Sequence, residues 1–233
     1  MKTLAIDTAN QALGVAICQN GLIIGEYITN LEKNHSVRLM PAIDQLMKDT
    51  QSSPDELEKI IVSKGPGSYT GVRIGLSTAK SLAWALDIPI VGVSSLEVLA
   101  YQGLFFDAKV CPFFDARRNN VFTGVYHSDN GKMVLAYDER NISMEEWLYK
   151  LKNREERVLF LSPDIAQYTG QINGIMGNLA VIPDGAYHIA KPSHLVLAGS
   201  HKKVNNTHTL TPNYLRLAEA EAKWLKSQKR YES

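Results

Sequence analysis

A glycine-rich stretch in the N-terminal half places the strongest constraint on how this chain can fold. It runs from Ser63 to Gly75 with the sequence SKGPGSYTGVRIG. The apolar residues 60–62 before it predict a buried strand, and residues 72–86 after it have the apolar spacing of a helix. A loop with several glycines can turn sharply, admit another group closely and present free backbone N–H groups at a helix start. The sequence therefore predicts a strand–loop–helix unit.

Two known phosphate-binding motifs do not fit this stretch. A P-loop has a lysine directly after its last glycine, whereas Gly71 is followed by Val72. A dinucleotide fingerprint needs a third glycine at the position where Thr70 stands. The loop must therefore be explained without either motif.

The helix after the loop has small residues along one face. Gly71, Gly75 and Ala79 recur every four residues, and this spacing places them on the same side. Each glycine inside a helix costs about 1 kcal/mol relative to alanine, so a close backbone contact must offset that cost. That contact is either packing within the same domain or docking of another chain, and the sequence leaves both open.

Composition is ordinary for a globular protein, with 45% hydrophobic and 21% charged residues. The net charge of +1 provides no general basic field for nucleic acid. A local basic cluster, Lys223, Lys226, Lys229 and Arg230, suits the end of a helix expected over residues 218–229.

The two cysteines and the N-terminus indicate a reducing location. Cys18 and Cys111 each lie in an apolar, strand-like run, which predicts buried thiols rather than a disulfide framework. The chain enters a strand at once, without a recognisable signal peptide or an apolar stretch of spanning length. We therefore expect a cytoplasmic protein.

The first hundred residues predict an α/β domain with a mixed sheet. A hairpin signal at Asn20-Gly21 joins two of three meandering strands, and Asp7 ends the first of them. A capping box at Ser53–Glu56 and a cap at Ser94 mark further helix starts. The expected elements are strands at 4–6, 13–18, 22–28, 60–62 and 90–93, and helices at 35–49, with Ser36 as a possible cap, and at 72–86.

The next segment repeats this pattern. An apolar run over 110–114 ends in Asp115, a strand begins at Val121, and Asn130-Gly131 is again a hairpin signal before a strand at 133–137. The step from Asp7 to Leu13 equals the step from Asp115 to Val121, which indicates one supersecondary unit used twice. Further elements are expected around Trp147, at 158–161, after Ser162-Pro163-Asp164, at 181–182 and at 193–201.

This duplicated unit resembles the actin/hexokinase/Hsp70 ATPase fold, in which two such domains face each other across a nucleotide cleft. The resemblance implies a domain of residues 1–102 plus a C-terminal helix over 212–230, and a second, smaller domain of residues 103–210. Individual motifs are similar to those of the bacterial TsaB (YeaZ) family from end to end: Leu4-Ala5-Ile6-Asp7-Thr8, His35-Ser36, the Gly65–Gly75 stretch, Asp115-Ala116-Arg117 and Pro212-Asn213-Tyr214-Leu215-Arg216.

The family resemblance implies a role in making N6-threonylcarbamoyladenosine at position 37 of tRNAs that read codons starting with A. In that system a separate synthase uses threonine, bicarbonate and ATP, and TsaD, a paralogue of the same fold, transfers the product to tRNA. TsaB-like proteins pair with TsaD, a small ATPase named TsaE joins them, and TsaB is regarded as a non-catalytic scaffold. ATP is then used by the complex, and direct tRNA contact by this chain stays open.

The histidines agree with a chain that has no metal site. The catalytic paralogue holds its metal with a His-x-x-x-His pair, a spacing that places two ligands on one helical face. No two histidines here have that spacing: His35, His127, His188, His194, His201 and His208. The last three are seven apart, but the loop at Asn205-Asn206 breaks any common helix. We expect no metal and no catalytic residue.

Some polar residues remain candidates for a nucleotide cleft. Glycine usually lets backbone N–H groups reach phosphate, but the turn after Asp7 has none, so we interpret Asp7 as a turn-capping residue. Ser162-Pro163 also stands where related chains more often show a glycine-rich turn. Arg117 and Arg118 suggest a solvated turn, or a contact with phosphate or a partner carboxylate. The candidates are Asp7, Thr8, Asp115 and Arg117.

Without chemical groups, a TsaB-like chain must act through its surface. The small-faced helix and the 35–49 helix are the expected docking face, for TsaD or, in its absence, for a second copy. The expected interface residues are Ser36, Leu39, Met40, Ile43, Met47, Thr70, Gly71, Ile74, Gly75, Thr78, Ala79 and Leu82. The alternative is a free-standing ATPase or kinase that uses Asp7 and Asp115. A peptidase is disfavoured because Ser68 has no identifiable histidine partner.

Overall fold

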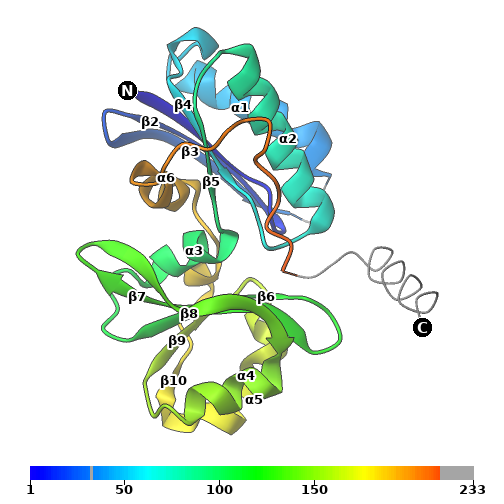
Figure 1. Cartoon of the computed structure of the whole chain (residues 1–233), viewed down its shortest axis with the longest axis vertical. Coiled ribbons are helices and arrows are strands. Elements are labelled where there is room, and N and C mark those ends of the chain that lie inside the picture. The colour runs from blue at the N-terminus through cyan, green and yellow to red at the C-terminus, as the bar shows by residue number, and fades with distance from the viewer. Residues whose placement is uncertain (32–33, 216–233) are drawn as a thin grey trace, which may run out of the picture.

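The computed structural model describes residues 1–31 and 34–215, which form two sheets with flanking helices (Figure 1). The first sheet has the strand order β3-β2-β1-β4-β5. Strands β1 to β3 are antiparallel neighbours, whereas β4 and β5 run parallel to β1. The strands are β1 (Lys2–Asp7), β2 (Ala12–Gln19), β3 (Leu22–Asn30), β4 (Lys59–Ser63) and β5 (Ile90–Val93).

The second sheet repeats this topology, with the order β8-β7-β6-β9-β10. Its meander is again antiparallel and its last two strands are parallel. The strands are β6 (Lys109–Asp115), β7 (Asn120–Asp129), β8 (Lys132–Ser143), β9 (Val158–Leu161) and β10 (Ala180–Val181). The duplicated unit predicted from sequence is confirmed, and each copy places an aspartate at the end of its first strand.

Helices separate and cover the sheets because both faces of each central strand are apolar. In β1, Leu4 and Ile6 join the core under α1 and α2, whereas Ala5 faces a second core that contains α3 and α6 and reaches the other sheet. A third core lies under α4 and α5. The helices are α1 (His35–Asp49), α2 (Tyr69–Ala85), α3 (Ser95–Ala100), α4 (Met144–Lys152), α5 (Ile165–Met176) and α6 (Pro192–Ser200). Short 3-10 turns are η1 (Pro54–Glu56), η2 (Tyr101–Gly103), η3 (Gly177–Leu179) and η4 (Gly185–His188).

Some helix starts differ from the sequence prediction. Asn34, not Ser36, is the N-cap of α1, and its side chain accepts a hydrogen bond from the Ser36 N–H. Helix α2 begins at Tyr69, three residues before the expected start, because Ser68 caps it by accepting from the Gly71 N–H. Helix α6 begins at Pro192, one residue before the expected start at 193, with Lys191 at the cap position.

The chain returns to the first sheet earlier than residue 212. Helix α6 contacts β1 and β2, and Asn205 forms a bridge with Ile90 of β5. Leu210 is buried in the same core as α1 and α2. The expected helix over 218–229, most of the 212–230 segment and the basic cluster lie outside the described residues.

Both cysteines are buried and free, as predicted. Burial raises the pKa of the Cys111 thiol to about 11, against hydrogen bonds from Thr123 and Trp147 that lower it. Within the described ranges, no helix is long and apolar enough to cross a membrane.

Candidate functional site: the inter-domain pocket and the α1/α2 surface

The glycine-rich loop packs against the turn that follows β1. The Ser68 N–H donates to the Ala9 carbonyl oxygen at 2.7 Å, and the Thr8 hydroxyl donates to the Gly71 carbonyl oxygen at 2.8 Å. A Cβ on Gly67 would lie 2.2 Å from the Ala9 carbonyl oxygen, so only glycine permits this approach. The Ser68 N–H, which the sequence analysis of a free helix start would assign to an anion, therefore donates to the chain's own turn.

The small face of α2 points into its own domain. A Cβ on Gly71 would lie 2.2 Å from the Thr8 carbonyl oxygen, and one on Gly75 would lie 2.3 Å from the Thr8 hydroxyl. Ala79 is fully buried in the core under α1 and α2. Of the two interpretations that the sequence left open, close packing within the same domain is confirmed. Gly71, Gly75 and Ala79 are covered by this packing, so they are not exposed to a second chain.

The remaining expected interface residues are either buried or exposed, depending on their position around the helix. Leu39, Ile43 and Met47 of α1 are buried in the first domain's core, so they are also removed from the docking face. The others are exposed or half-buried on the outer sides of α1 and α2: Ser36, Met40, Thr70, Ile74, Thr78 and Leu82. We call these six residues the α1/α2 surface.

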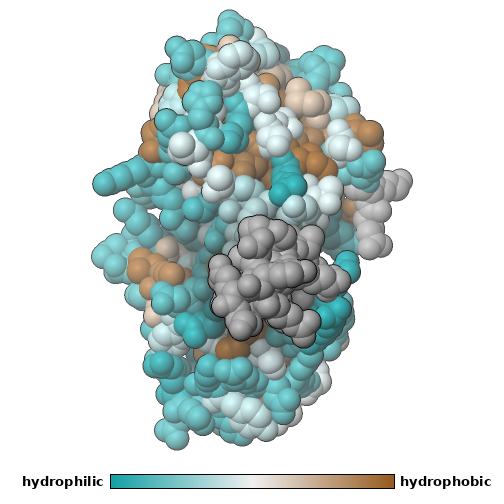
Figure 2. Space-filling model, turned by 45° about the vertical axis from the view of Figure 1, so that its right-hand side comes forward, coloured by the Kyte–Doolittle hydropathy of each residue, from teal (hydrophilic) through white to brown (hydrophobic). Residues whose placement is uncertain are grey.

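Further exposed apolar side chains lie near this surface, at positions that the sequence did not indicate. Val37 is 65% exposed beside Met40, and Trp84 is 71% exposed at the end of α2. Figure 2 shows hydrophobic patches among polar residues on the upper domain, in a view that brings the side of α2 forward. The helical repeat shows which residues share one side of a helix, but only the packed core shows which side faces outward.

Asp7 caps the turn after β1 and is buried. Its Oδ1 accepts a hydrogen bond from the Ala9 N–H at 2.9 Å, as a turn-capping aspartate does, while Oδ2 is buried without a hydrogen-bond partner. Burial raises the pKa of the Asp7 carboxyl, and the Ala9 hydrogen bond, Ser63 and His35 counteract it. His35 is itself held by the turn, since its Nε2 lies 2.8 Å from the Asn10 carbonyl oxygen.

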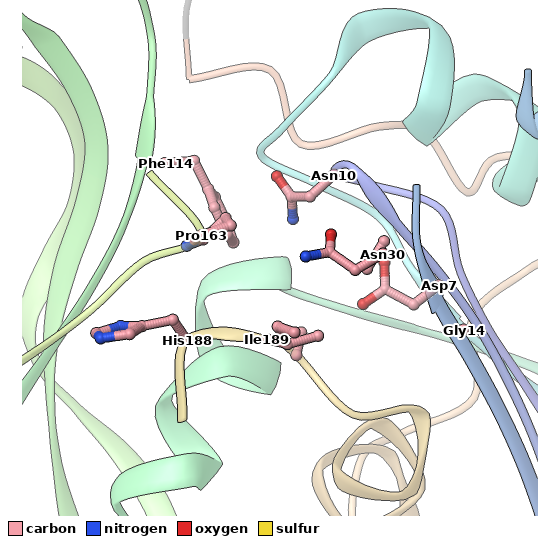
Figure 3. Close-up of a pocket in the computed structure, with 10 residues that line it drawn as sticks. Asp7, Asn10, Gly14, Asn30, Phe114, Pro163, His188 and Ile189 are labelled. Atoms are coloured by element: carbon pink, nitrogen blue, oxygen red, sulfur yellow. The ribbon is translucent and has the colours of Figure 1, made fainter. Parts of the chain in front are cut away.

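Asp7 faces a small pocket between the domains (Figure 3). Asn10 and Asn30 lie on its side of the pocket, and Phe114, Pro163 and His188 lie across from them. The cavity has a volume of about 20 Å³, enough for roughly one water molecule. Sites for drug-sized ligands span about 300–1,000 Å³, so the pocket in this conformation has no room for a nucleotide.

Asp115, the counterpart of Asp7, is engaged in a different network. Its carboxylate accepts from the Tyr168 hydroxyl at 2.7 Å and from the Arg117 N–H at 3.0 Å. Its own N–H donates to the Asp164 carboxylate at 2.9 Å, and burial raises the pKa of the Asp164 carboxyl. Asp115 does not line the pocket that contains Asp7. The predicted pair of phosphate-side aspartates is therefore not brought together in that cavity.

The turn after Asp115 is left-handed at consecutive positions. Arg117, Arg118 and Asn119 have φ values of 66°, 55° and 59°. The two arginines are exposed on this turn, outside the pocket lining.

His188 lines the pocket but is a structural residue. Its Nδ1 accepts from the Ser162 N–H at 3.1 Å, so its Nε2 carries the proton and donates to the Pro183 carbonyl oxygen at 2.8 Å. Across residues 1–31 and 34–215, no three histidine, cysteine or acidic side chains gather as metal ligands would.

Two sheets with the same duplicated topology, facing each other across a pocket, define the class of actin-like ATPase folds. A likeness of fold to component A of (R)-2-hydroxyglutaryl-CoA dehydratase from Acidaminococcus fermentans agrees, with a TM-score of 0.50 and 11% identity over 86% of this chain and 98% of that one. A YeaZ-like protein from Pseudomonas aeruginosa, described as having similarity to peptidase YeaZ, matches with a TM-score of 0.80 and 25% identity over 92% and 99% of the two chains.

Sequence comparison narrows the class to a family. The family model TsaD, described as tRNA N6-adenosine threonylcarbamoyltransferase, matches residues 23–224. The tRNA threonylcarbamoyladenosine biosynthesis protein TsaB of Bacillus subtilis is 49% identical over 98% of this chain and 100% of its own length. TsaB of Escherichia coli is 33% identical over 58% of this chain and 62% of its own. The chain belongs to the TsaB (YeaZ) family, and it takes part in threonylcarbamoyladenosine biosynthesis for tRNA modification.

Proposed function

We propose that this chain is a non-catalytic subunit that pairs with the TsaD-type transferase of the same fold, together with TsaE. The complex, in the cytoplasm, transfers the threonylcarbamoyl group to adenosine 37 of tRNAs that read codons starting with A. ATP is used by the complex rather than by this chain alone. The matches to TsaB relatives and to the TsaD family model support the pathway and the kind of partner.

The observation that carries the non-catalytic role is the state of the inter-domain pocket. The glycine-rich loop is packed on the turn after Asp7, where the Ser68 N–H is engaged, and the cavity beside Asp7 has room for roughly one water molecule. We infer from this arrangement that the chain contributes binding energy rather than chemistry. We infer that its α1/α2 surface binds TsaD and favours the competent arrangement of TsaD by differential affinity.

The α1/α2 surface suits a helical partner face. Both helices cover the same side of the first sheet, so their outer residues form one continuous face (Figure 1). Met40 and Ile74 supply apolar contact, and Thr70 and Thr78 are short enough to let a facing helix approach. The same surface would allow a second copy to bind when TsaD is absent, through a two-fold contact.

A mixing experiment tests the pairing. Titration calorimetry and size-exclusion chromatography would measure the affinity of the chain for its cognate TsaD. Met40→Glu is expected to weaken binding at least tenfold, because it replaces an exposed apolar side chain of the α1/α2 surface by a charged one. Tyr149→Glu on α4 is the matched control, since Tyr149 is 50% exposed and Met40 is 48% exposed. Equal affinities for the two variants would show that the surface is misplaced.

A tRNA modification assay tests the functional half. Cognate TsaD and TsaE, supplied with threonylcarbamoyl-AMP and unmodified tRNA, are expected to be slow without the chain and fast with it. Full modification in its absence would contradict the scaffold role. The alternative ATPase function would be supported instead by ATP hydrolysis by the purified chain that is lost in Asp7→Ala.

A further inference from the structure

An aromatic–guanidinium stack lies at the start of α2, where the end of the described chain folds back on it. The rings of Tyr69 and Tyr214 stack with centroids 5.5 Å apart and an interplanar angle of 26°. The guanidinium carbon of Arg73 lies 3.9 Å from the Tyr69 ring centroid, and Arg73 Nε donates to the Tyr214 hydroxyl at 2.8 Å. Residues 141 positions apart therefore build one site.

The stack is exposed but firmly held. Tyr69 is 48% exposed and Tyr214 is 44% exposed, although aromatic rings usually contribute more when buried. The residue before Tyr214 fixes its position, because the Asn213 N–H donates to the Lys64 carbonyl oxygen at 2.7 Å. The Asn213 side-chain amide donates to Glu139 of the second sheet at 3.0 Å. The rings and the guanidinium are thus ordered before any partner arrives.

Arg73 has a charge that the described part of the chain does not neutralise. No carboxylate among residues 1–31 and 34–215 forms an ion pair with it, and its contacts are with the two tyrosines. Because Nε–H is taken by Tyr214, the terminal Nη groups are the donors available to a new acceptor. A planar guanidinium in a fixed orientation is complementary to a carboxylate, which it can bind through two parallel hydrogen bonds.

The stack lies on α2 beside the α1/α2 surface. Tyr69 and Arg73 directly precede Thr70 and Ile74, so they form the next row around the same helix. Tyrosine and arginine are enriched among the residues that dominate binding energy at protein interfaces. A preordered guanidinium without an ion-pair partner among the described residues fits one acidic side chain on a facing helix.

We propose that the Tyr69–Arg73–Tyr214 stack binds a carboxylate of the TsaD-type partner at the end of the α1/α2 surface. This inference rests on the proposed function, since the partner is the one proposed there. The two rings hold the guanidinium in place and lower the entropy lost when the ion pair forms. The pair fixes the register of the two subunits in addition to strengthening their contact.

Titration calorimetry of the full chain against cognate TsaD tests the proposal. Arg73→Gln is expected to weaken binding roughly tenfold. Arg73→Lys should bind more tightly than Arg73→Gln but less tightly than the wild type, because lysine restores the charge without the two parallel N–H donors of a guanidinium. Tyr214→Phe, which removes the hydroxyl that accepts the hydrogen bond from Arg73 Nε, should weaken binding less than Arg73→Gln. Added salt should reduce the affinity of the wild-type chain more than that of Arg73→Gln.

Arg154→Gln is the matched control, because the Arg154 guanidinium also lies over an aromatic ring, 4.1 Å from the Tyr137 centroid, but on the second domain. It should bind TsaD as the wild type does. Urea unfolding of each variant separates loss of binding from loss of stability. A wild-type affinity for Arg73→Gln would overturn the proposal and leave the stack as an internal anchor.

Two other occupants of the guanidinium are outcomes of the same test. If Glu219→Gln, in the tail outside the described residues, lowers stability as Arg73→Gln does and neither changes TsaD binding, the carboxylate belongs to the chain's own tail. If Arg73→Gln abolishes only self-association, the occupant is a second copy. Either result overturns the proposal. Absence of any wild-type binding to TsaD would instead contradict the proposed function.

Discussion

At the residue scale, close contacts with the turn after β1 explain the glycines of the loop. The Thr8 carbonyl oxygen, the Thr8 hydroxyl and the Ala9 carbonyl oxygen occupy the space that side chains on Gly71, Gly75 and Gly67 would need. The same turn holds Asp7, whose buried carboxyl faces the inter-domain pocket. These close contacts therefore decide how α2 packs against the turn after β1.

Gly75→Ala is expected to destabilise the protein. Alanine favours a helix by about 1 kcal/mol over glycine, but its Cβ would lie 2.3 Å from the Thr8 hydroxyl, and such overpacking costs about 1–3 kcal/mol. Gly170→Ala in α5 is the control, because a Cβ there meets open space and only the helical preference remains. Urea unfolding should show a loss for the first variant and a gain of up to about 1 kcal/mol for the second; a gain for both would contradict the packing.

Asp7 should make the stability depend on pH. Because burial raises its pKa in the folded state above the ordinary 3.8, folding favours the protonated form. This contribution is fully present below pH 3.8 and is lost as the pH rises through the folded-state pKa. Asp7→Asn, which remains neutral, is expected to be more stable than the wild type at neutral pH, with a difference that shrinks towards pH 3.8. Urea unfolding at several pH values measures this; a constant difference would contradict the direction of the shift.

At the element scale, α1 and α2 each divide into a buried and an exposed side. Leu39, Ile43 and Met47 fill the core beneath α1, so Met40 and Val37 face outward. Helix α2 shows the same division, with Leu76 and Ala79 inside. The phase of each helix is set by packing against the sheet, and this phase determines which residues a partner can reach.

The start of α1 should depend on Asn34. Its side chain accepts hydrogen bonds from the Ser36 N–H at 3.3 Å and from the Ser36 hydroxyl. Loss of an N-cap usually costs about 0.5–2 kcal/mol, so Asn34→Ala should lower the free energy of unfolding by that amount. Ser36→Ala removes only the hydroxyl donor and should have a smaller effect. Denaturant unfolding of the two variants checks the order, and a larger effect for Ser36→Ala would restore Ser36 as the cap.

At the scale of the whole molecule, the end of the described chain ties the domains together. Asn205 bridges to Ile90, Leu210 enters the first core, and Lys80 donates to the carbonyl oxygens of His208 and Leu210. Glu139 of β8 then accepts hydrogen bonds from Ser94, Tyr126 and Asn213. One carboxylate thus joins the second sheet to the first domain.

Exchanging the amide and the carboxylate between Asn213 and Glu139 tests this connection between the domains. Asn213→Asp would set two carboxylates against each other, and it should lower the free energy of unfolding by about 1–3 kcal/mol. Adding Glu139→Gln should recover most of the loss, because the new amide donates to the new carboxylate while its oxygen still accepts from Ser94 and Tyr126. A double-mutant cycle by urea unfolding measures the coupling, expected at about 0.5–3 kcal/mol. Additive effects would mean that the two side chains do not interact in solution.

The order of the elements and their duplication were determined by the sequence itself. Alternating apolar residues, Asn-Gly turns and helix caps act over a few neighbouring residues, so the strands of both copies and most helix positions can be read directly. The spacing of Asp7 and Asp115 from the strands that follow them indicated the repeat, and the strand-like runs around the cysteines indicated buried thiols.

Only the tertiary structure decided what the small face of α2 contacts, how tightly the pocket closes and where the chain returns to the first sheet. Each depends on groups far apart in the sequence, such as the hydrogen bond from Thr8 to Gly71 across 63 positions. Glycines repeated along a helix face indicate that another backbone lies close to it. The same pattern is compatible with a strand of the same domain or with a helix of a partner. Which one is present follows from the packing of the whole sheet, because the side of a helix that buries the larger apolar area turns inward.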